Sequence, residues 1–345
     1  MPRTMPNSAR IAWVCATALA VFFVWLLVPA RTNVGIGFFY VVPIGLAAWW
    51  GGRRAGGVAL LGCACLYVIG SAIHPVPHLG ATFAVRLLTF VAVAILASLL
   101  REKMTGLEHS LEELEAIRAA LTPSALPQLP GVEAAAAFVP SEYGVSGDFY
   151  LLTNGPDSSA VAIVGDVVGH GPEAARLATF IRARFAAFAA STSDPAELLM
   201  LANRALFERP RHTRELVSAV CLRFRAEQAQ LSWAVAGHPL PLRLPGLDEL
   251  PAEPSTFLLG ADADLELSNR ETPLRAGDGV VVYTDGATDV RNDGAMLGID
   301  GLSRLLRPLA ELPPPAIVNQ VEKAILDWAG GPVRDDLCLL VLKPQ

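Results

Sequence analysis

Four long apolar runs fill the first hundred residues and restrict this part of the chain more than any other feature does. They span about residues 11–29, 34–50, 58–73 and 81–100. A helix that crosses a bilayer needs about 20 mostly apolar residues, and each run approaches that length, the third being the shortest. The runs therefore predict a four-helix transmembrane region over residues 1–100. With so few charges inside it, this region is better suited to anchoring or sensing than to forming a pore.

The charges of the two parts of the chain differ in sign. Residues 1–103 carry eight Lys or Arg and one acid, a net +7, whereas the remainder carries 19 basic and 32 acidic residues, a net −13. Basic residues lie before the first run, between the second and third, and after the fourth: Arg3, Arg10, Arg53, Arg54, Arg101 and Lys103. The positive-inside rule then predicts a multi-pass protein of the inner (cytoplasmic) membrane, with both termini in the cytoplasm. Nucleic-acid binding is not expected from an acidic remainder without a basic cluster.

Four further arginines are interpreted from their positions in the sequence. Arg86 is the one charge inside an apolar run, near its outer end, where its side chain is expected to reach toward the membrane surface. Arg176, Arg182 and Arg184 are expected to form a solvated helix face rather than a docking site for an acidic partner.

A helical linker is predicted at residues 101–121. Apolar residues recur there in steps of four and three, with one three-residue irregularity, which is the pattern of a short coiled coil: Leu100, Met104, Leu107, Leu111, Leu114, Ile117 and Leu121. We expect a homodimer through this linker, and the alternative is a single amphipathic helix lying on its own domain. Prolines from Pro123 onward end the helix.

From residue 122 onward the pattern changes to short strand-like runs with helices inserted in pairs. Strands are expected at 132–139, 149–153, 160–167, 216–224, 230–236, 265–271, 280–283 and 337–342, and helices at 172–190, 195–207, 301–309 and 315–329. Strands in this hairpin-like order favour an α+β sandwich over a parallel βαβ sheet.

Four aspartates lie at turns beside these strands. Asp148 lies in Ser-Gly-Asp-Phe-Tyr, Asp166 in Gly-Asp-Val-Val-Gly-His-Gly, Asp285 in Tyr-Thr-Asp-Gly and Asp335 in Arg-Asp-Asp-Leu. An aspartate beside a glycine is most often a turn residue that bonds its own backbone. Several carboxylates brought together from strand ends are, however, what a hard divalent cation requires. None of the five cysteines begins a Cys-x5-Arg sequence, so a cysteine-nucleophile phosphatase is excluded.

Six motifs taken in order carry a resemblance to a known family. They are Leu-Pro-x-Leu-Pro-Gly (126–131), Ser-Gly-Asp-Phe-Tyr (146–150), Gly-Asp-Val-Val-Gly-His-Gly (165–171), Ala-Gly-His-Pro-x-Pro (236–241), Tyr-Thr-Asp-Gly (283–286) and Asp-Asp-x-x-x-Leu-Val-Leu (335–342). Together they resemble the metal-dependent protein phosphatase (PPM) family, and within it the SpoIIE/RsbU-like bacterial serine phosphatases. The resemblance covers about residues 122–345 and implies a β-sandwich flanked by helices, with two Mn²⁺ or Mg²⁺ ions at one end.

The resemblance also implies roles for single residues. Asp166, with the carbonyl of Val167, matches the position that bridges the two ions. Asp148 matches a further carboxylate of the site, and Asp285 and Asp335 match ligands of one ion.

Other motif residues are expected to support these ligands. Gly169 and Gly171 let the backbone bend before a helix, and Asp336 has a supporting position. His170 is of a residue type that can act as a general acid, and the alternative, which we prefer, is that it shapes the turn or caps the helix. His238 is expected to fix a strand-to-turn junction rather than to perform chemistry. The nucleophile is expected to be a water activated by the metal ions rather than a side chain.

Two positions depart from the pattern common in the family. Ser146 replaces a glycine, which a turn tolerates, and Leu151 replaces an aspartate. The second change is expected to remove a carboxylate that would support the second ion or its waters.

The preferred hypothesis is a membrane-bound, metal-dependent serine/threonine phosphoprotein phosphatase in bacterial signalling. By resemblance its substrate is a phosphoserine on an anti-sigma-factor antagonist. One rival is a catalytically degenerate membrane receptor that uses the phosphatase fold to bind partners, and another is a phosphohydrolase that acts on a nucleotide or other small phosphate.

Overall fold

The structure is a computed structural model of the chain. It describes residues 7–27, 36–73, 79–121, 126–141, 147–209, 215–252, 257–292 and 294–345. The chain forms two compact units, Met1–Glu112 and Glu113–Gln345. The boundary falls inside the segment predicted as a linker.

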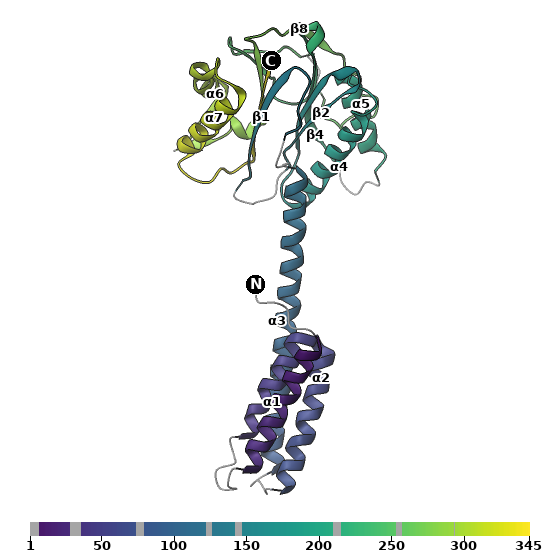
Figure 1. The fold of residues 1–345 in the computed structure, drawn as a ribbon, viewed down its shortest axis with the longest axis vertical. Coiled ribbons are helices and arrows are strands. Elements are labelled where there is room, and N and C mark those ends of the chain that lie inside the picture. Colours follow the sequence, from purple (N-terminus) through teal and green to yellow (C-terminus); the bar gives the residue numbers. More distant parts are fainter. Residues whose placement is uncertain are drawn as a thin grey trace. The chain divides into compact units, whose positions relative to one another are not determined.

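The first unit is built from long apolar helices. They are α1 (Asn7–Leu27), the short 3-10 helix η2 (Ile36–Tyr40), α2 (Val41–Ile73) and α3 (Leu79–Leu121) (Figure 1). Helix α2 contains residues 41–50 of the second apolar run and the whole of the third. Its backbone is not helical at Gly52, where φ is 70° and ψ is −161°. Few residues other than glycine adopt a positive φ, so Gly52 permits the break between the two runs.

Helix α2 folds back on itself at this glycine. A Cβ added to Gly56 would lie 2.9 Å from the Cβ of Ala48, whereas residues eight apart in a straight helix are about 12 Å apart. The turn lies beside α3, because the Arg53 side chain forms an ion pair with Glu102 at 3.0 Å. The second and third runs therefore form two antiparallel segments.

Two stretches of the described helices are long and apolar enough to cross a membrane by length and composition. They are Phe38–Ile73, which includes the fold-back, and Phe83–Leu107, and a shorter apolar helix covers Ser8–Val24. The predicted insertion of these helices in a membrane stays a prediction.

Arg86 does not reach outward as expected. Its side chain is 2% exposed, and its guanidinium donates a hydrogen bond of 2.7 Å to the hydroxyl of Tyr67. It also lies 4.9 Å from the ring centre of Tyr67 and 5.2 Å from that of Phe38. Contacts between a cation and aromatic faces offset part of the cost of burying the charge, so aromatic residues of two other helical segments replace the solvent that the sequence led us to expect.

The predicted coiled-coil seam is described only in part. Helix α3 extends to Leu121 as expected, and the seam residues Met104 and Leu107 are 48% and 63% exposed. The seam side chains beyond residue 107 lie outside the described ones, so the dimer stays a prediction.

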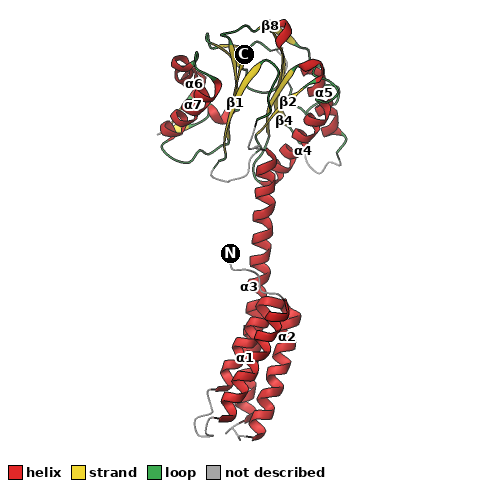
Figure 2. Ribbon diagram, in the orientation of Figure 1, coloured by secondary structure: helices red, strands yellow, loops and turns green. Residues whose placement is uncertain are grey.

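The second unit is a four-layer sandwich of two five-stranded sheets covered by helices (Figure 2). The first sheet has the order β1-β12-β9-β6-β7 and the second the order β2-β3-β4-β5-β8. The strands are β1 (Val132–Val139), β2 (Phe149–Asn154), β3 (Ala160–Val167), β4 (Val217–Arg225), β5 (Gln230–Ala236), β6 (Leu242–Leu244), β7 (Asp248–Glu249), β8 (Arg270–Pro273), β9 (Gly279–Tyr283) and β12 (Leu337–Pro344), and β10 (Arg291–Asn292) pairs with β11 (Ala295–Met296) outside the sheets. The helices are α4 (Pro172–Phe188), α5 (Pro195–Phe207), α6 (Gly298–Leu306) and α7 (Pro314–Ala329).

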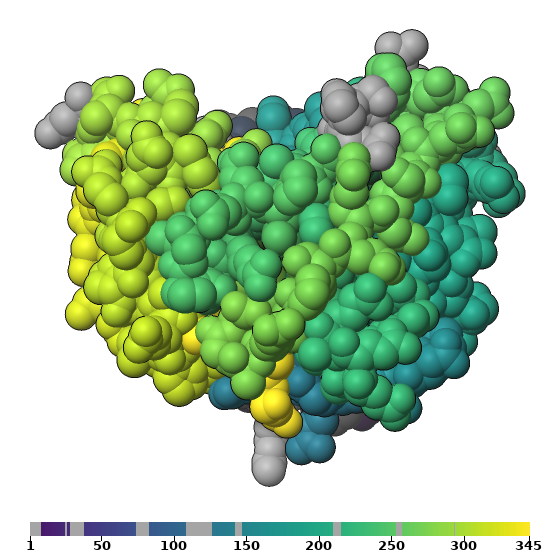
Figure 3. Space-filling model, turned by 90° about the horizontal axis from the view of Figure 1, so that it is seen from above, coloured from purple at the N-terminus to yellow at the C-terminus, as the bar shows by residue number. Residues whose placement is uncertain are grey.

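Alternation along the strands explains the layers. On β2, Tyr150 and Leu152 pack between the sheets, while Phe149 and Leu151 pack against α4 and α5. Side chains of a strand point alternately to its two faces, so strands covered on both faces are apolar throughout. Helices α6 and α7 cover the other sheet in the same way. Figure 3 looks onto one end of this unit, where green loop segments fill the surface between the yellow-green α6–α7 side and the teal α4–α5 side.

Two expectations for this unit are wrong. The strand expected at 265–271 forms only as β8, from Arg270 to Pro273, because its first residues pack in the loop over α5. Arg182 is not on a solvated helix face. Its Nε donates a hydrogen bond of 2.8 Å to the carbonyl oxygen of Tyr150 on β2, which is the last strand of its sheet. The arginine thereby satisfies an edge carbonyl that has no neighbouring strand.

Candidate functional site

The inner faces of several strands end on polar residues at the same end of the sandwich. On β3 the face that carries Ala162 and Val164 continues to Asp166, and Tyr150 on β2 is preceded on its face by Asp148. On β9 the face that carries Val280 and Val282 continues to Thr284 in the same way; all of these apolar residues belong to the core between the sheets. The period of two places Asp148, Asp166 and Thr284 at one edge of this core.

Asp148 is held from the opposite sheet. It is 3% exposed, and its Oδ2 accepts a hydrogen bond of 2.6 Å from the hydroxyl of Thr284. The same hydroxyl oxygen accepts a bond of 3.0 Å from the backbone N–H of Cys338 on β12. Asp148 is therefore tied to β9 and β12 although it precedes β2.

Asp336 and Asp335 are fixed at the start of β12. The Oδ1 atom of Asp336, a 5% exposed residue, accepts a hydrogen bond of 2.7 Å from the backbone N–H of Ser141. The Oδ1 atom of Asp335 accepts one of 2.9 Å from the N–H of Asp336. Asp335 itself is exposed, so its carboxylate faces the open end of the sandwich while Asp336 supports the turn.

The aspartates strongly affect one another's ionisation. Burial, followed by the charge of Asp285, raises the pKa of Asp166 to about 7, with Asp335 and Asp336 adding to the rise. Burial and then the charge of Asp166 raise the pKa of Asp148 well above its usual value, and a hydrogen bond joins these two carboxyls. Burial and then the charge of Asp335 also raise the pKa of Asp285. Asp166 thus lies at the centre of a crowded acidic cluster, in which ionisation is unfavourable without a positive charge nearby.

A space beside Gly147 is lined by oxygen atoms. A Cβ at this position would lie 2.7 Å from the carbonyl oxygen of Val167 and 3.1 Å from Oδ1 of Asp166. Two oxygen atoms thus lie beside the position that a side chain at residue 147 would fill, and oxygen donors of this kind suit a hard divalent cation. Within the described part of the chain, no three His, Cys, Asp or Glu side chains already lie close enough together to hold a metal ion. An ion would therefore have to draw the carboxylates inward.

The remaining motif residues lie around this cluster without entering it. Gly169 has a φ of 124°, and Gly171, with a φ of 83°, is the cap before Pro172 at the start of α4. His170 is exposed. His238 is 5% exposed, its Nδ1 lies 2.9 Å from the hydroxyl of Ser218, and burial lowers its pKa to about 3. Ser146 lies outside the described residues.

Leu151 does not lie beside the acidic cluster, contrary to the expectation that it removes a carboxylate supporting the second ion there. Leu151 is 5% exposed and belongs to the core between its sheet and α4 and α5, on the same face as Phe149. Asp148 lies on the opposite face of that strand, with Tyr150. A carboxylate at position 151 in this chain would enter an apolar layer and not the acidic cluster.

Leu151→Asp is accordingly expected to lower the free energy of unfolding by at least about 3 kcal/mol, because it buries an unpaired charge. Denaturant unfolding of residues 113–345 measures this change, with Leu151→Val as the matched apolar control at about 1 kcal/mol. Tighter Mn²⁺ binding by the aspartate variant at unchanged stability would contradict the placement of Leu151.

Gly286 brings two of the acidic segments into direct contact. A Cβ on this buried residue would lie 1.8 Å from the carbonyl oxygen of Asp336. Gly286→Ala is therefore expected to separate Asp285 from Asp336 and to lower the free energy of unfolding by about 3 kcal/mol, as overpacking does. Phosphate release should fall about a hundredfold, since a displacement of about 1 Å has that effect on catalysis.

The control for this substitution is Gly331→Ala, because no atom lies within 4 Å of a Cβ at Gly331. Denaturant unfolding and phosphate release are measured for both variants. Equal behaviour of the two would show that the contact at Gly286 does not position the aspartates.

Gly147, Ser141 and Thr284 are contacts of the acidic cluster for which no role was expected. Thr284 was detectable in principle, since it continues the inner face of a strand whose other members are valines. A hydroxyl at such a position needs a hydrogen-bond partner. Its partner lies 136 residues away in the chain, and only the folded structure identifies it.

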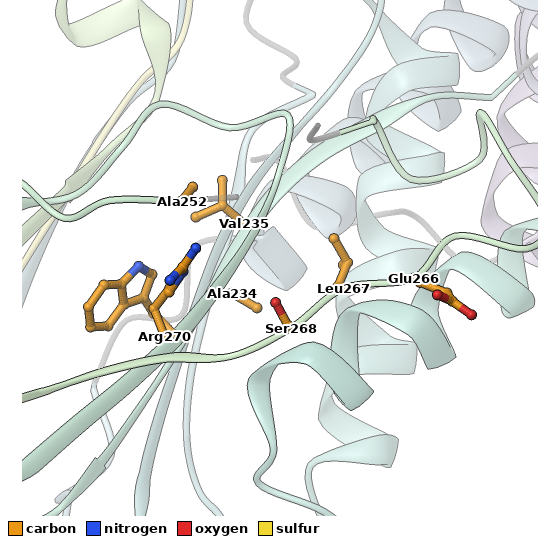
Figure 4. A pocket seen from close by; sticks show the side chains of 8 residues that line it. Ala234, Val235, Ala252, Glu266, Leu267, Ser268 and Arg270 are labelled. Carbon is orange, nitrogen blue, oxygen red and sulfur yellow. The ribbon is translucent and has the colours of Figure 1, made fainter. Parts of the chain in front are cut away.

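A shallow pocket elsewhere in this unit shares no residue with the acidic cluster. It lies along β5 and β8 and is lined by residues such as Val235, Ala252, Leu267, Ser268 and Arg270 (Figure 4). Its single acid, Glu266, points away along the loop. The chemistry of the aspartates is therefore not located in this pocket.

Comparisons with known proteins agree with the fold. The family described as stage II sporulation protein E (SpoIIE) matches residues 156–345, more than half of the chain. The phosphoserine phosphatase RsbU of Bacillus subtilis (strain 168) is 23% identical over 246 residues, which are 71% of this chain and 72% of that protein.

Two solved structures share the architecture. The SiaA-PP2C domain of Pseudomonas aeruginosa has a TM-score of 0.58 at 22% identity, covering 72% of this chain and all of that one. The RsbU and RsbW domains of a Mycobacterium tuberculosis protein have a TM-score of 0.56 at 22% identity, covering 64% of this chain. This chain spans 62% of that structure, less than two thirds of its length.

The structural likeness establishes a PP2C-like α+β fold, and the family match extends over the strands and turns that carry Asp166, Asp285 and Asp335. The chain belongs to the SpoIIE family and carries a PP2C-type, RsbU-like phosphatase domain.

Proposed function

We propose that this protein is a membrane-bound, metal-dependent serine/threonine phosphoprotein phosphatase. The observation that carries the proposal is the acidic cluster centred on Asp166, together with the oxygen-lined space beside Gly147. Five carboxylates lie close enough that the charge of one raises the pKa of another, and such a cluster destabilises the fold by itself. A bound cation is the simplest reason for their convergence.

We assign the ligand roles to Asp148, Asp166, the carbonyl of Val167, Asp285 and Asp335. Asp166 is central to the cluster, so it is the residue best placed to bridge two ions. Gly169 and Gly171 support the turn that follows Val167, and Asp336 anchors its own segment through Ser141. Mn²⁺ and Mg²⁺ both prefer such oxygen ligands.

Two bound divalent ions supply a water of lowered pKa as the nucleophile and neutralise the charge of the phosphate. The chain's own residues would bind and orient these ions. The carboxylates would balance the positive charge of the ions, and Gly147 leaves room for the ligand oxygens. The buried His238 stays neutral at physiological pH and has a structural position beside Ser218, so we assign it no proton transfer.

The membrane and partner assignments follow from the first unit and from the relatives. The apolar helices support a multi-pass anchor over residues 1–100 in the inner (cytoplasmic) membrane, with the phosphatase domain (122–345) in the cytoplasm. The segment 101–121 would then join the two as a coiled coil that also dimerises the protein. The likeness to the phosphoserine phosphatase RsbU supports a phosphoserine protein as substrate, and we propose an anti-sigma-factor antagonist for this role.

The test is phosphate release from a phosphoserine protein by the full chain in lipid vesicles, with Mn²⁺ and after its removal with a chelator. We expect turnover that disappears on chelation and returns with Mn²⁺. A folded protein that binds phosphoproteins without turnover would support the degenerate receptor instead. Far better turnover of a nucleotide or other small phosphate would support the small-molecule phosphohydrolase.

A further inference from the structure

Thr284 is the residue outside the proposed ligand set that contacts it most directly. It is fully buried at the end of β9, and its hydroxyl is 2.6 Å from Oδ2 of Asp148. At this length the bond is a short O–H···O hydrogen bond. The bond links strands on opposite sheets of the sandwich.

A second contact holds the hydroxyl of Thr284. The backbone N–H of Cys338 donates to the Thr284 hydroxyl oxygen at 3.0 Å, and the backbone N–H of Thr284 donates to the carbonyl of Cys338 at 3.1 Å. A hydroxyl can accept and donate at the same time, so the Thr284 oxygen accepts from Cys338 while its proton is donated to Oδ2 of Asp148.

The side chain has little freedom to turn away. Threonine is branched at Cβ, which restricts its χ1 angle, and the two bonds to β12 hold its backbone and its oxygen at once. The Thr284 hydroxyl holds Oδ2 of Asp148, and a hydrogen bond also joins the carboxyl groups of Asp148 and Asp166.

We infer that Thr284 is a positioning residue, which orients the Asp148 carboxylate so that one of its oxygens faces the metal site. The inference rests on the proposed function and deepens it, since it explains how a ligand before β2 is aligned with ligands that follow β9 and precede β12. Hydrogen-bond partners of metal ligands commonly set ligand orientation, and their loss weakens metal affinity about 10- to 100-fold.

A structural role alone makes a different prediction. If the hydroxyl served only to satisfy the buried N–H of Cys338, removing it would lower stability without changing Mn²⁺ affinity. The deciding measurement is therefore Mn²⁺ binding, followed through the electron paramagnetic resonance signal of free Mn²⁺. It is made beside the melting temperature and phosphate release at varied Mn²⁺, with the full chain in detergent micelles.

Three variants give the comparison. Thr284→Val keeps the shape and removes the hydroxyl, and we expect its Kd for Mn²⁺ to rise about 10- to 100-fold, with a smaller change in kcat at saturating Mn²⁺. Thr284→Ser keeps the hydroxyl and should stay within about threefold of the wild type. The control Thr153→Val alters a threonine at the far end of β2, whose hydroxyl contacts only the Asn154 carbonyl at 3.5 Å, and should match the wild type.

A second measurement tests whether Thr284 acts through Asp148. In an Asp148→Asn background, Thr284→Val should weaken Mn²⁺ binding no further, because the two changes remove the same interaction. If Thr284→Val does not fold, Thr284→Ala removes the hydroxyl without placing a methyl group there and is read in the same way.

The outcomes separate this inference from the proposed function. A wild-type chain that neither binds Mn²⁺ nor releases phosphate overturns the function. A wild type that does both, beside a Thr284→Val variant with unchanged Mn²⁺ affinity, overturns only the role of Thr284. Equal losses in Thr284→Ser and Thr284→Val, or independent losses in the double variant, also overturn it.

Discussion

Replacing Asp166 by asparagine is expected to reduce phosphate release from a phosphoserine protein by about a thousandfold or more. Asp166 lies at the centre of the acidic cluster, where Asp148, Asp285 and Asp335 all influence its ionisation. A neutral amide at this position would weaken the binding of both proposed ions. Metal ions contribute several kcal/mol to such a reaction, and about 4 kcal/mol corresponds to a thousandfold change in rate. Initial rates at saturating Mn²⁺ measure the effect.

The matched control is Asp327→Asn, which makes the same chemical change at an exposed position on α7. Its activity should stay within about twofold of the wild type, as expected for a surface substitution. An Asp166→Asn variant that kept more than a tenth of the wild-type rate would show that the central aspartate is not a ligand on which turnover depends.

Strand periodicity in the sequence was sufficient to predict most of the second unit. The runs 132–139, 160–167 and 230–236 form strands with the expected bounds, because strands covered on both faces are apolar throughout and end abruptly at turns. The four aspartates were also identifiable, since each follows or precedes such a strand. Elements of two or three residues, such as β7 and β10, carry too little pattern to be recognised.

Side-chain partners could not be predicted in this way. Arg182 and Arg86 were both expected to face solvent or the membrane surface. Arg86 is instead buried and Arg182 half-buried, and each donates to a specific acceptor. Leu151 looked like a lost carboxylate because it stands where the family often has an aspartate, but positions 148 and 151 lie on opposite faces of the strand. The outcomes for the two arginines depend on contacts between residues more than 15 positions apart, which a local pattern does not contain.

Asp166→Asn is also expected to stabilise the second unit at pH 7.5 when no metal is bound. The pKa of Asp166 is raised from 3.8 to about 7, first by burial and then by the charge of Asp285. Such a carboxyl contributes stability that is complete below pH 3.8 and is lost as the pH rises through 7. Asparagine does not ionise and avoids this loss, which amounts to at most about 4 kcal/mol at 1.36 kcal/mol per pKa unit. The asparagine variant should gain this stability at pH 7.5 and lose the advantage near pH 4.

His238 makes the comparison with the variant necessary. Burial lowers the pKa of His238 from 6.5 to about 3, so its contribution is complete above pH 6.5 and is lost as the pH falls through 3. The two groups therefore change the stability of the wild type in opposite directions over nearly the same range, and its total stability can look almost independent of pH. Since the asparagine variant retains His238, the difference between the two proteins isolates Asp166 and its coupled partner Asp148.

Added Mn²⁺ should reverse the order of stability. Residues 113–345, unfolded by denaturant at pH 7.5 with a chelator, should be more stable as Asp166→Asn. With Mn²⁺ at a hundred times its Kd, the wild type should gain about 2.7 kcal/mol and the variant much less. Mn²⁺ affinity of the wild type should also rise with pH up to about 7, since the ligand carboxyl must lose its proton to bind. A variant no more stable than the wild type without metal would show that Asp166 ionises without penalty. Equal stabilisation of both proteins by Mn²⁺ would place the ion elsewhere. If the order of stability reverses as expected, the same carboxylates destabilise the metal-free protein and bind the metal.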